Sequence, residues 1–197
     1  MRRLASPLAR LAGAALLALA AGCAPEPFAG TDVSGAAYGG RIELSDTQGR
    51  ARTLADFRGK AVVVFFGYMN CPDVCPTTLT EAAQALATLG KDGERVQVLF
   101  ITVDPERDTP ELLTRYVNAF DARFLALRGN AEATARVARG FRVFSQKNAP
   151  DASGAYAVDH SAGLYLLDPK GKLRVYLGPG KGAQALAHDL RLLLEGA

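Results

Sequence analysis

The sequence predicts an α/β fold in which helices flank a central mixed β-sheet. Three observations carry this prediction. Residues 61–66 form a continuous apolar, β-branched run, which is typical of a strand buried on both faces. Strand and helix patterns then alternate along the chain, as expected when helices connect neighbouring strands. Near the end, residues 164–177 form a hairpin pattern, which adds antiparallel strands to the sheet.

The first half of the domain contains three expected strands and one helix. Arg41–Ser45 alternates apolar and polar residues and ends at a turn over 46–49. After the buried run, Pro76 suits the first residue of a helix that continues to about Leu89. Val96–Val103 is the second strongly apolar strand.

The middle of the chain alternates in the same way. Thr109 is a suitable N-cap for a helix over 110–120 that begins with proline. Residues 124–127 form a short expected strand, and Asn130 is a suitable N-cap for a helix over 131–139. We expect both helices to connect strands of the same sheet.

The last part of the domain is a hairpin followed by a helix. Strands are expected at 164–167 and 173–177, joined by the turn Asp168–Gly171. The final helix, over about 183–195, puts Leu186, Ala187, Leu190 and Leu194 on one face. A thioredoxin-like domain is one fold with this order of elements, and its active loop lies between a buried strand and the next helix.

The charge of the chain argues against a nucleic-acid partner. The 197 residues carry a net charge of +3, from 23 basic and 20 acidic side chains. Arg2, Arg3 and Arg10 belong to an N-terminal segment that has no acidic residue. The remainder is therefore neutral, and the basic character reflects a targeting segment.

The N-terminal segment has the pattern of an export signal. Residues 1–22 combine a basic start with the apolar stretch Leu11–Ala21, and Cys23 follows as in a bacterial lipoprotein processing site. We expect Cys23 to carry lipid and residues 24–40 to form a flexible tether rich in alanine, glycine and proline. The domain at 41–197 would then be membrane-anchored in the bacterial cell envelope, outside the cytoplasm.

Two cysteines form the most informative motif. Cys71 and Cys75 lie four positions apart, between the buried strand and the helix expected at Pro76. Two thiols at this spacing can hold a soft metal, form a disulfide, or do both. Because Pro76 disfavours a helical conformation at the preceding residue, we expect Cys75 at the mouth of the helix, where the helix dipole would lower its thiol pKa.

A metal at these thiols would need a further ligand. Two soft sulfur donors favour Cu(I), zinc or an iron–sulfur cluster, but a cluster usually needs four cysteines. His160 lies in a small-residue segment that could fold over the cysteines, whereas His188 falls on the polar side of the last helix. Two thiolates and one imidazole would give Cu(I) a trigonal site, and Cu(II) the same set plus another donor.

Four segments together resemble the Sco/SenC family of copper-binding proteins. They are Phe65–Tyr68, Cys71–Leu79, Val103–Pro110 and Val158–Ser161. The resemblance covers about residues 41–194. It implies a thioredoxin-like fold, membrane tethering, and copper bound as Cu(I) or Cu(II) by two cysteines and one histidine, which match Cys71, Cys75 and His160.

The resemblance also implies a function. Family members assist assembly of the binuclear copper centre of cytochrome c oxidase subunit II, which would make this chain a copper metallochaperone supplied by an upstream copper donor protein. Asp73, Asp104 and Asp159 are candidates for roles around the site, although aspartates also stabilise turns. Asp159 in particular could orient the imidazole.

An enzymatic function is the alternative. The pair Cys71 and Cys75 could act as a thiol–disulfide reductase that keeps the cysteines of the target copper site reduced. A thiol peroxidase is suggested by the fold alone. Substitution of His160 separates the first two functions, because copper binding needs the imidazole and thiol exchange does not.

Overall fold

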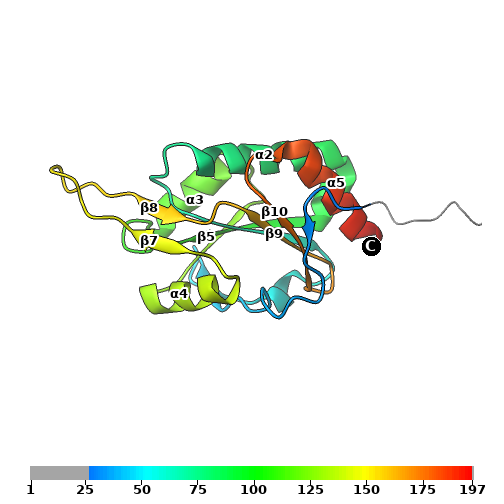
Figure 1. The fold of residues 1–197 in the computed structure, drawn as a ribbon, viewed down its shortest axis with the longest axis horizontal. Helices are drawn as coiled ribbons and strands as arrows, with labels where there is room; N and C mark the ends of the chain where they lie inside the picture. The colour runs from blue at the N-terminus through cyan, green and yellow to red at the C-terminus, as the bar shows by residue number, and fades with distance from the viewer. Residues whose placement is uncertain (1–26, 197) are drawn as a thin grey trace, which may run out of the picture.

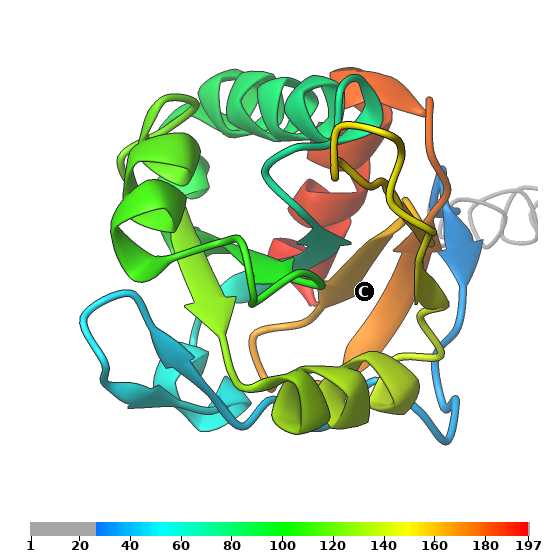
Figure 2. The same ribbon diagram turned by 90° about the vertical axis from the view of Figure 1, so that its left-hand side faces the viewer.

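The computed structural model describes residues 27–196, which form a mixed sheet covered by helices on both faces. Helices α2 (Val74–Leu89), α3 (Pro110–Asn118) and α5 (Gly182–Glu195) lie on one face of the sheet. Helix α4 (Ala131–Gly140) covers the other face (Figure 1). Figure 2 looks onto one end of the molecule, where α2 and α4 enclose the sheet from opposite sides.

The main sheet has the strand order β1-β10-β9-β4-β5-β6-β2-β3. Strands β4, β5 and β6 are parallel, and the strands on either side of them pair antiparallel. The strands, in spatial order, are β1 (Thr31–Asp32), β10 (Leu173–Leu177), β9 (Leu164–Leu167), β4 (Ala61–Gly67), β5 (Val96–Thr102), β6 (Leu125–Arg128), β2 (Leu44–Asp46) and β3 (Ala51–Arg52). The expected mixed sheet is therefore present.

Two apolar cores, one on each face of the sheet, explain why β4 reads as a continuous hydrophobic run. Its side chains alternate between the faces, so that Val63 and Phe65 contact the α2 side while Val64 and Phe66 contact the α4 side. All seven residues of β4 are buried. This central strand fixes the position of the loop that follows Gly67.

The helix starts differ from expectation at one place. Thr109 and Asn130 cap α3 and α4 as predicted, because each side chain accepts a hydrogen bond from a backbone N–H in the first turn. Helix α2 begins at Val74, so Pro76 lies inside the first turn and not at its first position. The first-turn N–H groups lack intrahelical partners, so proline costs no hydrogen bond there. Short 3-10 turns, η1 (Leu54–Phe57) and η2 (Gly90–Arg95), connect other elements.

The N-terminal segment packs against the domain. Strand β1 pairs with β10, and the buried Asp189 of α5 accepts hydrogen bonds from the N–H groups of Ala29 and Gly30, at 2.7 and 2.9 Å. Residues 29–32 of the expected flexible tether are therefore attached to the domain, because a buried carboxylate and a strand edge supply partners for their backbone. The expected signal segment at 1–22 and Cys23 lie outside the described residues.

A two-stranded ribbon was not expected from the sequence. Strands β7 (Ser145–Lys147) and β8 (Val158–His160) pair antiparallel, and the hairpin between them projects from the end of the molecule (Figures 1 and 2). The ribbon is separate from the main sheet. Among residues 27–196, no helix has the length and apolar character needed to cross a membrane.

Candidate metal centre

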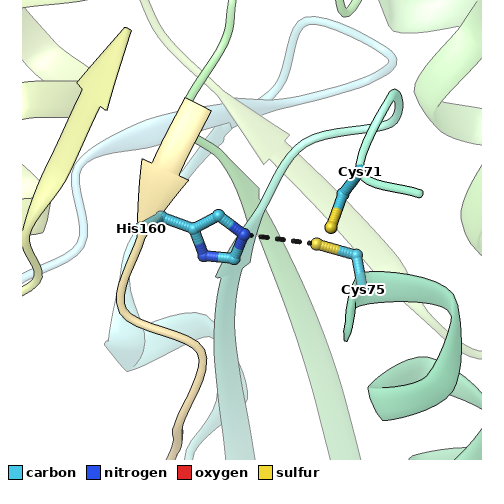
Figure 3. Close-up of side chains that lie close together, drawn as sticks. All are labelled: Cys71, Cys75 and His160. Atoms are coloured by element: carbon cyan, nitrogen blue, oxygen red, sulfur yellow. Dashed lines mark hydrogen bonds between the residues drawn. The ribbon is translucent and has the colours of Figure 1, made fainter. Parts of the chain in front are cut away.

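Three potential metal ligands converge at one end of the sheet. Ligand atoms of Cys71, Cys75 and His160 all lie within 4.8 Å of one another. The two sulfurs lie next to each other, and the Cys75 Sγ points toward the imidazole Nε2, 3.5 Å away (Figure 3). Donors bound to one tetrahedral ion, with metal–sulfur and metal–nitrogen bonds of about 2.3 and 2.0 Å, lie about 3.5 Å apart. The spacing of Cys75 and His160 therefore fits a shared metal ion, and Cys71 lies within 4.8 Å of both.

The two cysteines come from the loop after β4 and the first turn of α2. The N–H of Cys71 donates to the Tyr68 carbonyl at 3.3 Å, which closes a tight turn. Cys75 is fully buried, directly beside Gly67. A Cβ atom at Gly67 would lie 2.8 Å from the Cys75 sulfur, so only glycine leaves room for this thiol. Both cysteines are free thiols.

The prediction of a lowered pKa for Cys75 is wrong. Burial raises the pKa of this thiol, and the neighbouring Cys71 and Asp108 raise it further, although a backbone hydrogen bond from Tyr68 opposes the shift. The position at the helix start was expected correctly, but the dipole effect is outweighed by the loss of water around a buried sulfur. Without a bound cation, Cys75 is held as a protonated thiol.

His160 is the last residue of β8, and its ring is held from several sides. Its Nδ1 lies 3.1 Å from the Ser161 carbonyl, which leaves Nε2 free to face the sulfurs. Tyr68 and Phe65 pack edge-on against the ring, with centroids 5.8 and 6.3 Å away. Burial lowers the pKa of His160, so the imidazole favours the neutral form that binds metals.

The three aspartates selected from the sequence have different environments. Asp73 is exposed and accepts a 3.4 Å hydrogen bond from Thr77. Asp104 is buried, and it accepts hydrogen bonds from Arg107 and from the Tyr156 hydroxyl. The Asp73 side chain therefore makes a local contact at the start of α2, whereas Asp104 belongs to a buried network of hydrogen bonds.

Asp159 does not make the contact expected of it. Its exposed carboxylate accepts a hydrogen bond from the Asn148 side chain at 3.2 Å. The partner of the His160 Nδ1 is the Ser161 carbonyl. The reason is the strand geometry, because successive side chains of β8 point to opposite faces of the ribbon.

His188, the weaker candidate, lies away from the site. It is on α5, where its Nε2 lies 3.1 Å from the Pro27 carbonyl. The chain thus brings together three of the predicted residues and leaves this histidine in the N-terminal contact region.

Asp108 is a residue of the site that the sequence reasoning did not select. Its buried carboxylate accepts hydrogen bonds from the Thr102 hydroxyl at 2.6 Å and from the Met69 N–H at 3.3 Å. It therefore ties the cysteine loop to the end of β5. A signal was present, because Asp108 belongs to the Val103–Pro110 motif.

Comparison of the sequence with known families gives a consistent result. A family model described as SCO1/SenC matches residues 31–195. The bovine mitochondrial protein SCO2 homolog is 42% identical over 154 residues, which cover 77% of this chain and 58% of that relative. The chain therefore spans less than two thirds of the length of this curated relative.

Solved structures agree with the family match. The copper-bound ScoI of Bradyrhizobium japonicum is 39% identical, with a TM-score of 0.72 and coverage of 79% of this chain and 98% of its own. The apo Sco1 of Thermus thermophilus is also 39% identical, with a TM-score of 0.77 and coverage of 87% and 99%. The expected thioredoxin-like α/β fold is confirmed. The chain belongs to the SCO1/SenC family.

Proposed function

We propose that the chain binds copper through Cys71, Cys75 and His160 and hands it on during assembly of cytochrome c oxidase. The observation that carries this proposal is the convergence of two sulfurs and one imidazole nitrogen within 4.8 Å. Thiolate and imidazole donors suit Cu(I), and the neutral imidazole suits Cu(II) as well. The copper-bound relative from Bradyrhizobium japonicum supports copper over zinc.

The donor set also suits transfer of the ion. Copper is cargo here, so the site must bind it firmly and then exchange ligands with an acceptor. Cys71 is 8% exposed and Cys75 is buried, whereas His160 is partly exposed on a separate ribbon. We infer that the acceptor approaches from the side of Cys71 and His160, while Cys75 keeps its bond to the ion longest.

The cellular setting extends the proposal. The acceptor would be the binuclear copper centre of cytochrome c oxidase subunit II, and an upstream copper donor protein would load the site. A lipid on Cys23 would hold the domain at a membrane of the bacterial envelope, outside the cytoplasm. Mass spectrometry of the membrane-extracted protein tests the anchor, because lipidation adds acyl chains to a mature N-terminus at Cys23.

A thiol–disulfide reductase is the second candidate, and the contact between the two thiols favours it. Cys71 and Cys75 are both free and lie side by side (Figure 3). Oxidation of the pair would reduce one disulfide of a target, with two electrons and two protons passing to the target cysteines. Cys71 is the more accessible thiol and would attack first.

One experiment separates the two functions. Reduced wild-type protein and the His160→Ala variant are titrated with Cu(I) against a competing chelator, and both are assayed for reduction of a model dithiol target. We expect His160→Ala to weaken copper binding by more than the roughly 10-fold to 100-fold that loss of a ligand's supporting partner costs, because it removes a proposed ligand, and to leave thiol exchange largely intact. His188→Ala is the matched control and should bind copper as the wild type does.

The copper proposal makes a second demand on the same samples. A disulfide between Cys71 and Cys75 removes both thiolate donors, so oxidised protein should take up no Cu(I). Stoichiometric Cu(I) binding by the oxidised protein would contradict the proposed ligand set, as would wild-type affinity in the His160→Ala variant.

A further inference from the structure

The ligand His160 is carried by a ribbon that needs an attachment of its own. Strands β7 and β8 pair with each other and not with the main sheet. A two-stranded hairpin is marginally stable by itself. Some contact outside the ribbon must therefore keep the imidazole beside the sulfurs, which belong to the opposite wall of the site (Figure 3).

Arg107 makes several contacts between the ribbon and the domain. Its guanidinium carbon lies 3.5 Å from the centre of the Tyr156 ring, and its Nη1 donates to the Tyr156 carbonyl at 2.8 Å. Its Nε donates to Asp104, which also accepts the Tyr156 hydroxyl at 3.0 Å. Arg107 and Asp104 therefore contact the ring, the carbonyl and the hydroxyl of Tyr156. Tyr156 lies four residues before His160 in the chain.

The other strand of the ribbon is attached to the same loop. The Nζ of Lys147 lies 4.1 Å from the centre of the Tyr156 ring and 2.7 Å from a carboxylate oxygen of Glu106. This pair is exposed and contributes little alone. The Arg107 contact is different, because its guanidinium stacks on a ring and donates from two nitrogens to two separate acceptors, which the single ammonium of lysine cannot reproduce.

We propose that Arg107 and Tyr156 are positioning residues for the metal centre, because their contact holds the ribbon so that the His160 imidazole stays beside Cys75. The effect on copper binding rests on the function proposed above. The claim that the Arg107–Tyr156 contact holds the ribbon in place does not. Arg107 touches neither sulfur nor imidazole in the described contacts. It acts through Tyr156 of the ribbon, and its guanidinium carbon also lies 5.8 Å from the centre of the Tyr68 ring that packs on the imidazole. Loosening the contact should leave the dithiol intact and remove the nitrogen donor.

The test uses Arg107→Lys and Tyr156→Leu, with Arg142→Lys as the matched control. Arg142 stacks on Tyr38, 4.5 Å from the ring centre, on the α4 side of the sheet. Hydrogen–deuterium exchange of the metal-free proteins reports on the ribbon. We expect amides of residues 145–160 to exchange faster in the first two variants, while β4 and β5 exchange as in the wild type. The control should match the wild type throughout.

Copper binding then tests the link to His160. With Cu(II) as the probe, Arg107→Lys should weaken binding about 10-fold to 100-fold and change the thiolate-to-copper absorption band in the same way as His160→Ala. The double variant of Arg107→Lys and His160→Ala should bind no more weakly than His160→Ala alone, because both changes remove the same donor. Tyr156→Phe keeps the stacked ring and should have a smaller effect.

The two proposals fail in different ways. If the wild type binds copper but Arg107→Lys keeps wild-type exchange and wild-type affinity, the positioning role is overturned and the proposed function stands. If the wild type binds no copper, the proposed function fails. Hydrogen–deuterium exchange of residues 145–160 still decides whether Arg107 and Tyr156 hold the ribbon in place.

Discussion

The Sγ of Cys75 and the Nε2 of His160 lie 3.5 Å apart, although 85 positions separate the two residues in the chain. The Cys75 sulfur belongs to the first turn of α2, and the His160 nitrogen belongs to the ribbon of β7 and β8, which is separate from the main sheet. The site is therefore assembled from two separate parts of the chain, the cysteine loop with the start of α2 and the ribbon that carries His160. Each part makes predictions that can be tested separately.

The first prediction concerns the close approach at Gly67. A Cβ atom there would lie 2.8 Å from the Cys75 sulfur and 2.8 Å from the Phe100 ring. We expect Gly67→Ala to displace Cys75, to lower the free energy of unfolding by roughly 1–3 kcal/mol, and to weaken Cu(I) binding. Urea unfolding and chelator competition measure the two effects.

A matched control for this substitution exists at Gly140, where an added Cβ meets nothing within 4 Å. Gly140→Ala should leave both measurements near their wild-type values. If Gly67→Ala behaved in the same way, the close contact between Gly67 and the thiol would not constrain the site.

The second prediction concerns Asp108 beneath the cysteine loop. Asp108→Ala leaves the Thr102 hydroxyl and the Met69 N–H without their acceptor. Because these groups stay buried or partly buried, we expect a loss of roughly 1–3 kcal/mol in the free energy of unfolding. Cu(I) affinity should fall about 10-fold as the loop loosens. Asp73→Ala, at an exposed carboxylate, should change neither quantity.

The third prediction is a pH dependence of stability from Asp46. Burial tends to raise the pKa of this carboxyl, but hydrogen bonds from Arg50, Arg52 and Gln48 outweigh burial and lower the pKa from 3.8 to about 2. A lowered folded-state pKa stabilises the protein above the unfolded-state value, and this contribution is lost as the pH falls from about 4 toward 2. The shift corresponds to about 2 kcal/mol.

Asp46→Asn removes this contribution. We expect the variant to unfold more easily than the wild type at pH 7, by about 2 kcal/mol, and the gap to close between pH 4 and pH 2. Denaturant unfolding across this range measures it. A constant gap at every pH would mean that the carboxylate charge is not what stabilises the turn.

The fourth prediction concerns the N-terminal segment held by Asp189. Asp189→Ala removes the acceptor for the N–H groups of Ala29 and Gly30. Hydrogen exchange at β1 should become faster, and the free energy of unfolding should fall by roughly 1–3 kcal/mol. Copper affinity should stay at the wild-type value, because the contact between Asp189 and the N–H groups of Ala29 and Gly30 lies on α5 and not at the metal centre. If the β1 amides of the variant exchanged as slowly as in the wild type, Asp189 would not be what holds the N-terminal segment.

The parts of the fold that could be predicted from the sequence are those with a strong local signal, either a continuous apolar run or a helix-capping residue. The run at 61–66 identified β4, and Thr109 and Asn130 identified two helix starts, because each depends on local chemistry. The two cysteines were identified by their spacing, and His160 was selected by its small-residue segment and then supported by the family resemblance. Long-range partners were not needed for any of these inferences.

The features that the sequence did not predict depend on contacts between distant residues. Strands β1 and β7 are short and fully exposed, so neither carries a hydrophobic pattern. Asp189 follows His188, which was expected on the polar side of the last helix, but Asp189 is buried beneath a segment 160 positions away. The pKa of Cys75 was expected to fall, because the burial of this thiol in the core on the α2 side of the sheet cannot be deduced from local sequence.

The central claim is that two sulfurs and one imidazole nitrogen bind the same copper ion. X-ray absorption spectroscopy of the reduced protein loaded with one equivalent of Cu(I) measures this directly. We predict two sulfur ligands and one imidazole nitrogen, with the nitrogen scattering lost in His160→Ala and kept in His188→Ala. A wild-type spectrum with two sulfur ligands and no imidazole contribution would contradict the account.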